Sequence, residues 1–498
     1  MVKLIPALAG AVLACLWLAF GWLLRRASRQ IRRLDRVLAA RPAPAPALPS
    51  RDLRPRLSVV VAARDEAEAI ERTIRSLLAQ RQVPLEIIAV DDRSTDATGA
   101  ILDRLAAGET GDGPSRLVVL HNRELPDGWL GKCHACHLGA ARAVGDWILF
   151  MDGDVSLAPD DLLARILGLA EEDRIDHVAI LPDSRPMSAL QFSLMAVFGH
   201  LYLLAARAWE IDRDLTRGGA GVGAFNLVRR AAYERVGGYR LLRLDPADDY
   251  KLGRILKESG ARQRIFDGVN RVRCPWHRGA LAVIRGLEKN MFAGLNYSLV
   301  ALLALTLQAA VTLLGPAVVA AAGLVAAVRG GGSPGLAILA LTGIAAQILV
   351  VAWAFVDQTR RAGGSPLILA LLYPVGVTLI LFAAWNSAIR TLWRGGGPLA
   401  RHVLPAEPSA AGIGPGRGRP PIRGFLERPG VRSQGTRTPA ARNRPAFRRP
   451  RTRFASESGK ASVSTRTPAA AASPRNSSPS RRVLAVTVRT TLSWNSRA

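Results

Sequence analysis

Four long apolar stretches organise the chain, and a long polar region separates the first stretch from the second. The stretches cover residues 4–24, 297–328, 335–356 and 366–393. A run of about 20 apolar residues is long enough to cross the hydrocarbon core of a bilayer as a helix. The pattern predicts an N-terminal transmembrane anchor over residues 1–26 and about three C-terminal transmembrane helices over residues 297–394.

The first stretch admits a second interpretation, a cleaved signal peptide. Only Lys3 precedes it, and mostly apolar sequence continues past Cys15, where the box Val12–Cys15 resembles a lipoprotein cleavage site. A signal peptide needs a shorter apolar core and a small-residue cleavage site after it. An uncleaved anchor is therefore favoured.

The charge that follows the anchor predicts its orientation. Six arginines lie between Arg25 and Arg36, and positively charged flanks stay on the cytoplasmic side. We therefore expect a multi-pass protein of the inner (cytoplasmic) membrane with residues 25–290 in the cytoplasm. Three C-terminal spans would place the basic tail outside, against the same rule, so the side of the tail stays open.

Within the polar region, β-rich apolar runs alternate with helical patterns. The runs lie at 57–63, 85–90, 117–120 and 147–151, and the helical patterns at 66–80, 97–107 and 132–144. Such alternation is typical of a parallel sheet with helices on both faces. Residues 57–280 are therefore predicted to form an α/β domain with a Rossmann-like, mostly parallel sheet.

Segments around this domain have a different character. Residues 27–56 are basic and Pro/Ala-rich, which predicts a linker. Residues 187–209 are apolar and aromatic but shorter than the spans, so they form either a core helix or a helix lying on the bilayer. Residues 281–296 have the pattern of an amphipathic interface helix. Residues 395–498 are rich in Pro, Arg, Ser and Ala, which predicts a disordered basic tail.

The net charge of +28 is carried largely by that tail, which together with Arg394 holds 21 Lys and Arg against three Glu. A basic tail can bind anionic lipid headgroups or nucleic acid. It lacks repeated aromatic residues between the charges, so no specific nucleic-acid partner is expected.

The four cysteines are too few for a disulfide scaffold. Two of them belong to the segment Cys133–His137, which contains two Cys and two His and raises the possibility of a zinc site. Four ligands within five residues leave no loop to wrap a tetrahedral ion, so packing on an Ala-rich helix is favoured.

Carboxylates follow the apolar runs and supply the candidate chemistry. Asp91-Asp92 and Asp152-Gly153-Asp154 each end a predicted strand, and Asp248-Asp249 comes about a hundred residues later. The carboxyl ends of parallel strands form the ligand-binding edge of an open α/β sheet. Asp152 and Asp154, one residue apart, can hold a hard cation such as Mg²⁺ or Mn²⁺, which can neutralise a diphosphate. The pattern indicates an enzyme that acts on a nucleotide diphosphate.

Five segments in this order resemble the family 2 glycosyltransferases, which have the GT-A fold. They are VVVAARDEA (59–67), IIAVDDRSTDAT (87–98), Gly131-Lys132, Asp152-Gly153-Asp154 and Asp248-Asp249-Tyr250. The resemblance covers about residues 57–290 and the membrane flanks. LPDGWLGK (125–132) and RGLEKNMFAG (285–294) are similar to membrane-bound members that glycosylate lipids in hopanoid and carotenoid pathways.

The resemblance implies roles for residues that bind the nucleotide-sugar donor, with a UDP-sugar expected. Ala63, Arg64 and Glu66 would line the base and ribose. Asp91 and Asp92 follow the second strand, and Asp92 is the better candidate for the contact to the base. For Asp91 and Asp92, the alternative role is capping of the following helix. Lys132 would balance the charge of the diphosphate.

The resemblance also implies the catalytic and acceptor residues. Asp249, with its neighbour Asp248, occupies the position of the catalytic base, and a nearby acid can raise the pKa of a base. The segment 218–225 matches the small-residue acceptor site. The QxxRW motif of processive members is absent, and Lys289 is the candidate replacement for its arginine. This absence argues against a processive polysaccharide synthase.

We therefore expect an inverting, metal-dependent glycosyltransferase that moves a sugar to a membrane lipid at the cytoplasmic face. A polyprenyl-phosphate glycosyltransferase and a polysaccharide-synthesis enzyme are the enzymatic alternatives. A membrane scaffold that recruits anionic partners through its basic tail is the non-enzymatic one.

Overall fold

The computed structural model describes most of the chain up to residue 393. The described residues are 4–42, 55–108, 115–211, 213, 218–275, 279–295, 297–329, 334–362 and 365–393. The predicted basic tail, residues 395–498, and most of the Pro/Ala-rich part of the predicted linker lie outside them.

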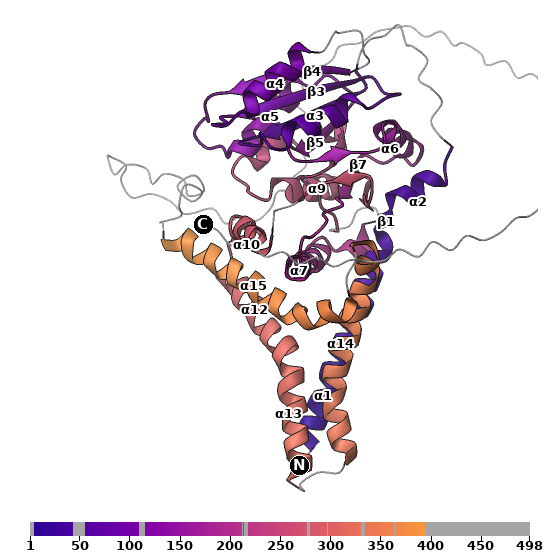
Figure 1. Ribbon diagram of the computed structural model, residues 1–498, viewed down its shortest axis with the longest axis vertical. Coiled ribbons are helices and arrows are strands. Elements are labelled where there is room, and N and C mark those ends of the chain that lie inside the picture. The colour runs from indigo at the N-terminus through magenta and orange to yellow at the C-terminus, as the bar shows by residue number, and fades with distance from the viewer. Residues whose placement is uncertain are drawn as a thin grey trace, which may run out of the picture. The chain divides into compact units, whose positions relative to one another are not determined.

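An eight-stranded, mostly parallel sheet forms the centre of the polar region (Figure 1). Its strands, in spatial order, are β1 (Arg32–Arg33), β9 (Gln263–Asp267), β7 (His177–Leu181), β8 (Asn226–Arg229), β5 (Trp147–Asp152), β2 (Leu57–Ala63), β3 (Leu85–Asp92) and β4 (Ser115–Asn122). Only β8 runs antiparallel to its neighbours. A small second sheet pairs β6 (Ser156–Leu157) with β10 (Val272–Arg273). The α/β, GT-A-like fold predicted from the sequence is confirmed.

The central strands are buried on both faces because successive side chains point to opposite sides. In β2, Val59 and Val61 belong to one core and Val60 belongs to the other. Helices α3 (Ile70–Leu78), α4 (Thr98–Ala107) and α6 (Leu162–Glu172) contribute to the first core. Helices α5 (Gly131–Arg142), α8 (Arg230–Arg235) and α9 (Asp248–Glu258) cover the opposite face. Near-continuous apolar runs such as 57–63 are typical of strands covered in this way.

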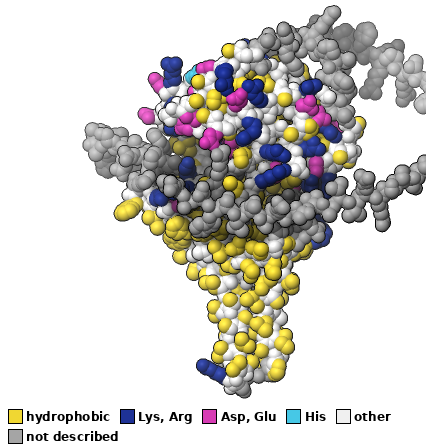
Figure 2. Space-filling model, in the orientation of Figure 1, with side chains coloured by type: hydrophobic (Ala, Val, Ile, Leu, Met, Phe, Trp, Pro, Cys, Tyr) yellow, Lys and Arg dark blue, Asp and Glu magenta, His cyan; other side chains and the backbone are white. Residues whose placement is uncertain are grey.

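Four described helices are long and apolar enough to cross a membrane. They are α1 (Ile5–Gln30), the continuous helix Leu299–Val328, α14 (Pro334–Ala362, apolar to Ala354) and α15 (Pro366–Trp393). Figure 2 shows hydrophobic side chains over the part of the molecule that these helices form and charged side chains over the sheet domain. The structure thus has candidate membrane-spanning helices at the N-terminal stretch and at the three C-terminal stretches where the sequence predicted spans.

The helix over Leu299–Val328 is continuous. It consists of α12 (Leu299–Ala309), a π-helical turn (Ala310–Leu314) and α13 (Gly315–Val328). Pro316 lies in the first turn of α13, where its missing N–H is tolerated.

Helix α7 (Ala189–Ala205) is the short apolar helix whose position the sequence left open between core and bilayer surface. Its apolar side chains pack in one cluster with α15 and with α10 (Ala280–Glu288), and the Ser193 hydroxyl donates to the Leu372 carbonyl 3.0 Å away. It therefore joins the membrane helices to the sheet domain.

Part of the predicted linker belongs to the folded domain. Arg32 and Arg33 form β1, which pairs with β9, and α2 (Leu34–Ala39) buries Leu34 and Leu38 in the core. The predicted interface helix over 281–296 is divided into α10 and α11 (Met291–Gly294).

Candidate active site

The carboxyl ends of β2, β3 and β5 bring the first set of predicted residues to one edge of the sheet. In the parallel register, Ala62 pairs with Val90 and with Asp152, and Ala63 pairs with Asp91. Residues far apart in the sequence therefore meet here, as expected for an open α/β sheet.

The next feature is a cluster of charged side chains around Gly223. Lys132 Nζ lies 2.6 Å from Asp152 Oδ1. A Cβ atom on Gly223 would lie 2.7 Å from Asp152 Oδ2, 2.8 Å from Asp249 Oδ2 and 3.2 Å from Lys132 Nζ. The predicted donor residues and the predicted base therefore converge on a backbone position that only glycine can occupy without displacing them.

Asp249 lies at the start of α9 with its two carboxylate oxygens in different roles. Oδ1 accepts from the Tyr250 N–H at 2.7 Å, whereas Oδ2 faces the position of Gly223. Burial raises the pKa of Asp249, and the Asp152 carboxylate adds to this against the opposing effect of Lys132. Asp249 thus combines the capping role with a carboxylate oxygen that faces the cluster.

Asp248 is buried, contrary to the alternative in which both acids are solvated helix caps. Burial raises its pKa, with Lys132 opposing and Asp249 adding to the shift. Its Oδ2 has no hydrogen-bond partner among the described residues. Lys132 has a raised pKa although desolvation opposes it, because the carboxylates of Asp152, Asp248 and Asp249 surround its ammonium group.

A second carboxylate group lies on the other side of Asp152. Burial, with the charges of Asp154 and Asp152, raises the pKa of Glu66 to about 7. Burial and the charge of Asp152 also raise the pKa of Asp154. The Cys274 thiol lies 3.6 Å from both oxygens of Asp154. The raised pKa values of Glu66 and Asp154 beside the Asp152 carboxylate favour a bound cation, and the hard oxygens of these groups suit Mg²⁺ or Mn²⁺.

No described group of three or more His, Cys, Asp or Glu side chains is arranged to hold a metal ion by itself. Carboxylates of Asp152 and Asp154 would therefore hold such an ion together with oxygens from a bound diphosphate, in the way Mg²⁺ is usually bound.

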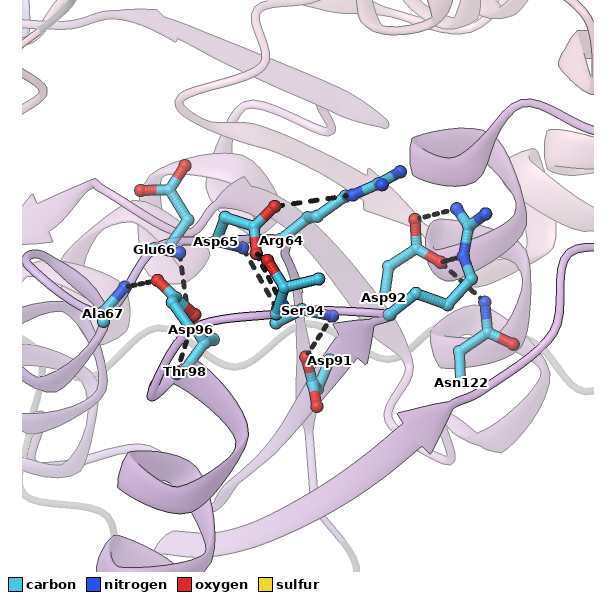
Figure 3. A network of polar contacts seen from close by, with 12 residues as sticks. Arg64, Asp65, Glu66, Ala67, Asp91, Asp92, Ser94, Asp96, Thr98 and Asn122 are labelled. Atoms are coloured by element: carbon cyan, nitrogen blue, oxygen red, sulfur yellow. Dashed lines mark hydrogen bonds and ion pairs between the residues drawn. The ribbon is translucent and has the colours of Figure 1, made fainter.

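The loops after β2 and β3 are joined by hydrogen bonds (Figure 3). Ser94 and Thr98 accept from the N–H groups of Asp65 and Glu66, at 3.1 and 2.8 Å. Asp65 Oδ1 accepts in return from the Thr95 N–H at 2.7 Å. This network holds Glu66 at the edge of the site, whereas the side chain of Arg64 is about half exposed.

The two acids at the end of β3 have protein partners. Asp92 pairs with the Arg93 guanidinium at 2.8 Å and accepts from Asn122 at 2.7 Å (Figure 3). Asp91 lies 3.0 Å from His121 Nδ1. Asp91, Arg93 and His121 line a second, smaller pocket of about 570 Å³. Asp92 could contact the nucleotide base of a donor only after Arg93 moves away from it. The sequence did not indicate this pairing.

A cavity of about 3110 Å³ joins the charged cluster to the membrane helices. Lys132, Asp152, Asp248, Asp249 and Lys289 all line it. Apolar side chains from the helices line it as well, among them Phe192 and Met195 of α7, Leu281 and Ile284 of α10, and Leu379 and Phe382 of α15. The resemblance suggested Lys289 as the replacement for the arginine of the absent QxxRW motif. Lys289 is exposed and lines the same cavity as the predicted base, Asp249.

Three residues near the site were missed by the sequence analysis. Gly223 was predicted only as part of a small-residue segment, and Cys274 was only counted. Tyr202 of α7 donates from its hydroxyl to the Gly221 carbonyl at 3.1 Å. Helix α7 therefore contacts the predicted acceptor segment, residues 218–225. No pattern in the sequence placed Tyr202 there.

The segment Cys133–His137 packs as an ordinary helix. Cys133 and Cys136 lie in the second core, and His137 stacks on Trp129 with ring centroids 4.9 Å apart. The packing interpretation is confirmed.

The sequence model of the family described as "Glycosyl transferase family 2" matches residues 58–237. The matched range contains the ends of β2, β3 and β5, and it ends before Asp248. Residues 58–237 form a family 2 glycosyltransferase domain.

Similar proteins support this assignment at low identity. The chain is 21% identical over 240 residues to a 4,4'-diaponeurosporenoate glycosyltransferase of Staphylococcus aureus, covering 48% of this chain and 61% of that protein. It is 38% identical over 114 residues to the succinoglycan biosynthesis protein ExoO of Rhizobium meliloti, covering 23% and 30%. The matches therefore span less than two thirds of these relatives.

Two solved structures are similar to parts of this chain at low sequence identity. One is the mannosyltransferase PcManGT from Pyrobaculum calidifontis in complex with GDP-Man and Mn²⁺, at 20% identity and a TM-score of 0.42, covering 78% of this chain and 99% of that one. Another is Staphylococcus aureus TarS 1-349 in complex with UDP-GlcNAc, at 15% identity and a TM-score of 0.33, covering 68% and 92%.

Replacing Gly223 with alanine tests the cluster directly. The new methyl group must displace Asp152 Oδ2 or Asp249 Oδ2, because both lie within 3 Å of its position. A displacement of about 1 Å at reacting groups can cost about 10²-fold in rate, so we expect sugar transfer to fall by about that factor. Gly168→Ala is the matched control, since no atom lies within 4 Å of its Cβ position. Equal rates in the two variants would contradict the convergence of these groups.

The link between Asp91 and His121 predicts a pH dependence of stability. His121 Nδ1 and Nε2 lie 3.0 and 2.9 Å from carboxylates of Asp91 and Asp103, and these bonds raise its pKa. The contribution is complete below the unfolded pKa of about 6.5 and is lost as pH rises through the higher folded pKa. In thermal unfolding of the full chain, we expect the midpoint difference between wild type and His121→Gln to be larger at pH 6 than at pH 9. A difference that grows with pH would contradict the assignment.

Proposed function

We propose that the chain is an inverting glycosyltransferase that moves a sugar from a nucleotide-sugar, most simply a UDP-sugar, to a membrane lipid. The observation that carries this proposal is the cavity of about 3110 Å³, because one wall holds Asp249 and another is made of apolar side chains from α7, α10 and α15. A lipid could extend its chain between the helices while its headgroup reaches the carboxylate. A water-soluble acceptor would gain nothing from such a lining.

Asp249 acts as the general base in this proposal. Its Oδ2 accepts the proton of the acceptor hydroxyl as the oxygen attacks the anomeric carbon. Its raised pKa makes it a stronger base than an ordinary aspartate, since burial and Asp152 disfavour its charge. A single displacement from the face opposite the leaving nucleotide inverts the anomeric centre.

The donor residues act on the other side of the sugar. The Lys132 ammonium, 2.6 Å from Asp152, is placed to balance the charge that develops on the leaving diphosphate. Lys289 lies on the wall of the same cavity and would add a second cation. A Mg²⁺ or Mn²⁺ ion held by Asp152 and Asp154 would supply Lewis-acid stabilisation of the departing nucleoside diphosphate.

The reaction is proposed to take place at the cytoplasmic face of the inner membrane. The support is the run of arginines after α1, of which Arg25, Arg29, Arg32 and Arg36 are exposed, because such residues stay on the cytoplasmic side. Nucleotide-sugars are present on that side.

A phosphate-bearing acceptor, such as a polyprenyl phosphate, is the second candidate. It is favoured by the cations that line the same cavity, among them Arg29, Arg285 and Arg390. A phosphate oxygen is already ionised near neutral pH and needs little help from a base. Transfer that survives Asp249→Asn would therefore favour this acceptor.

The function is tested with the full chain in lipid nanodiscs that contain extracted bacterial membrane lipids. UDP-glucose, UDP-N-acetylglucosamine and GDP-mannose, each with a radiolabelled sugar, are supplied separately with Mn²⁺. The expected result is label in the organic phase, with the lipid product identified by a sugar-sized mass increase. Label confined to free sugar or to water-soluble polymer would overturn the lipid acceptor.

A further inference from the structure

Three buried polar side chains lie side by side on three neighbouring strands, next to the site but outside its cavity. They are His177 on β7, Asn226 on β8 and Gln263 on β9, each at most 1% exposed. None of them is among the residues that line the large cavity. Buried polar groups are costly unless every hydrogen bond is satisfied.

The three side chains form one chain of hydrogen bonds between two backbone groups of the site. Gln263 Oε1 lies 3.1 Å from the Ala220 nitrogen, and Gln263 Nε2 lies 2.5 Å from His177 Nδ1. His177 Nε2 lies 2.5 Å from Asn226 Oδ1, and Asn226 Nδ2 lies 3.4 Å from the Asp249 carbonyl oxygen. Gln263 Nε2 also donates to the Gly253 carbonyl at 3.0 Å.

The two ends of the chain determine the direction of every bond between them. The Ala220 N–H can only donate, so Gln263 must accept with Oε1 and donate with Nε2 to His177 Nδ1. Burial lowers the pKa of His177 to about 4, so the imidazole is neutral and has one donor and one acceptor. It must then carry its proton on Nε2, donate to Asn226 Oδ1, and leave the Asn226 amide to donate to Asp249.

Both ends of this network belong to groups that the proposed reaction needs. Ala220 lies in the acceptor segment, one residue before Gly221, whose carbonyl accepts from Tyr202. Asp249 is the proposed base. The charged groups on the same elements are engaged elsewhere: Asp176 bonds Arg229 at 3.2 Å, and the Lys257 ammonium donates to the carbonyls of Ile211 and Arg213.

We propose that His177, as the Nε2–H tautomer, is a positioning residue that fixes the backbone of the base Asp249 relative to the acceptor segment through Asn226 and Gln263. This inference rests on the proposed function, since it assigns His177 a part in the transfer step. It acts through hydrogen-bond direction rather than through contact with substrate.

The test is Gln263→Glu, which keeps the shape of the side chain but removes the donor to His177 Nδ1. When the new acid is protonated at low pH, its O–H can still donate to Nδ1 and preserve the wild-type tautomer. When the new carboxylate is ionised it can only accept, so the Gly253 carbonyl loses its donor and His177 must carry a proton on Nδ1. As an imidazolium it still donates to Asn226, which keeps its bond to Asp249. As a neutral Nδ1–H imidazole it accepts at Nε2, so the Asn226 amide reverses and presents its oxygen to the Asp249 carbonyl.

We therefore expect kcat of Gln263→Glu to stay within a few-fold of wild type at low pH. It should then fall by about tenfold per pH unit above a new pKa that wild type lacks, while KM for the nucleotide-sugar is unchanged. Gln80→Glu is the matched control, because Gln80 is equally buried and donates to the Pro159 carbonyl far from this network. A loss of kcat that is equal at every pH, as in Gln80→Glu, would overturn the inference and leave a structural role.

A second measurement, made on the wild-type chain, does not depend on transfer. In the full chain labelled with ¹⁵N-histidine, the His177 resonances, identified by their loss in His177→Gln, should show a protonated Nε2 and an unprotonated Nδ1. The opposite tautomer overturns the inference even if transfer is found. Absence of transfer in wild type, with the Nε2–H tautomer present, overturns the proposed function and with it the catalytic part of the inference.

Discussion

Replacing Asp249 with asparagine is expected to lower sugar transfer by about 10²–10⁴-fold, the usual contribution of a general base. The substitution keeps the volume of the side chain and its Oδ1, which accepts from the Tyr250 N–H. It removes the negative charge at Oδ2, the oxygen that faces Asp152 and Lys132 across Gly223. The start of α9 should therefore be preserved while proton transfer from the acceptor is lost.

Donor affinity is the measurement that separates the roles of Asp249. Transfer rate and nucleotide-sugar binding are measured in the same purified variant, with Asp160→Asn as a control because Asp160 is exposed and pairs only at the surface with Arg81. We expect binding to stay close to wild type, since Asp91, Asp152 and Lys132 remain. Rate and affinity falling together would identify Asp249 as a donor ligand or a helix cap, and no change in either would place the base elsewhere.

The predictable part of the fold is the part with local signals. Runs such as Ile87–Val90 are apolar and rich in β-branched residues, and they alternate with helical patterns, so their strands follow from periodicity alone. The strands β7, β8 and β9 lack this clarity because each carries a buried polar residue, His177, Asn226 or Gln263. Their polarity breaks the apolar pattern by which buried strands are recognised, and it is explained only by the hydrogen bonds that they make with one another.

The folded part of the predicted linker, β1 and α2, could not be predicted from the sequence for a different reason. Arg32 and Arg33 look like juxtamembrane charge, yet their backbone pairs with Phe266 and Asp267 at the sheet edge. An edge strand of two residues depends on backbone groups, which all sequences share, so composition cannot reveal it. Leu34 and Leu38 are four residues apart, and this spacing is the only sequence sign that α2 packs on the core.

The site was predicted as a set of residues but not as a geometry. The positions of Asp152, Lys132 and Asp249 followed from strand ends and from the resemblance, and the structure brings them together. The partners of Asp92 depend on Arg93 and Asn122, which belong to different elements. The Asp152 carboxylate also raises the pKa of Asp249, although the two residues are about a hundred positions apart, because the distance between side chains, not their separation in sequence, decides which charges interact.

The contact between the apolar helices and the candidate site could not be predicted from the sequence of the helices or from that of the sheet domain. Helix α7 is apolar enough to resemble a short span, but Tyr202 at its C-terminal end contacts Gly221 of the acceptor segment. Tyr250, next to the proposed base, donates in turn to the Ala205 carbonyl of α7 at 2.9 Å. The helix that packs against α15 therefore also holds the two sides of the proposed acceptor site, which is consistent with an acceptor that arrives from the bilayer.

Replacing Asp154 with asparagine is expected to cause a loss of comparable or larger size. Asp154 is partly buried next to Cys274, and its pKa is raised by burial and by the charge of Asp152. If Asp154 holds a divalent cation, its loss removes stabilisation of several kcal/mol from the departing diphosphate, which corresponds to roughly 10³-fold in rate. The protein itself should become slightly more stable in the absence of metal, because a neutral amide relieves the repulsion among Glu66, Asp152 and Asp154.

Asp154→Asn is thus expected to lower sugar transfer and to raise the stability of the metal-free protein, and each effect can be measured separately. Transfer is measured in wild type and in Asp154→Asn over a range of Mn²⁺ concentrations, and thermal unfolding is measured with and without EDTA. We expect wild-type transfer to stop in EDTA and return with Mn²⁺, and wild-type unfolding to shift upward with Mn²⁺, whereas the variant should respond to neither. Undiminished wild-type turnover in EDTA would exclude the metal mechanism. A variant that loses both activity and metal-free stability would show that Asp154 supports the fold through Cys274 rather than a cation, because relief of repulsion predicts the reverse change in stability.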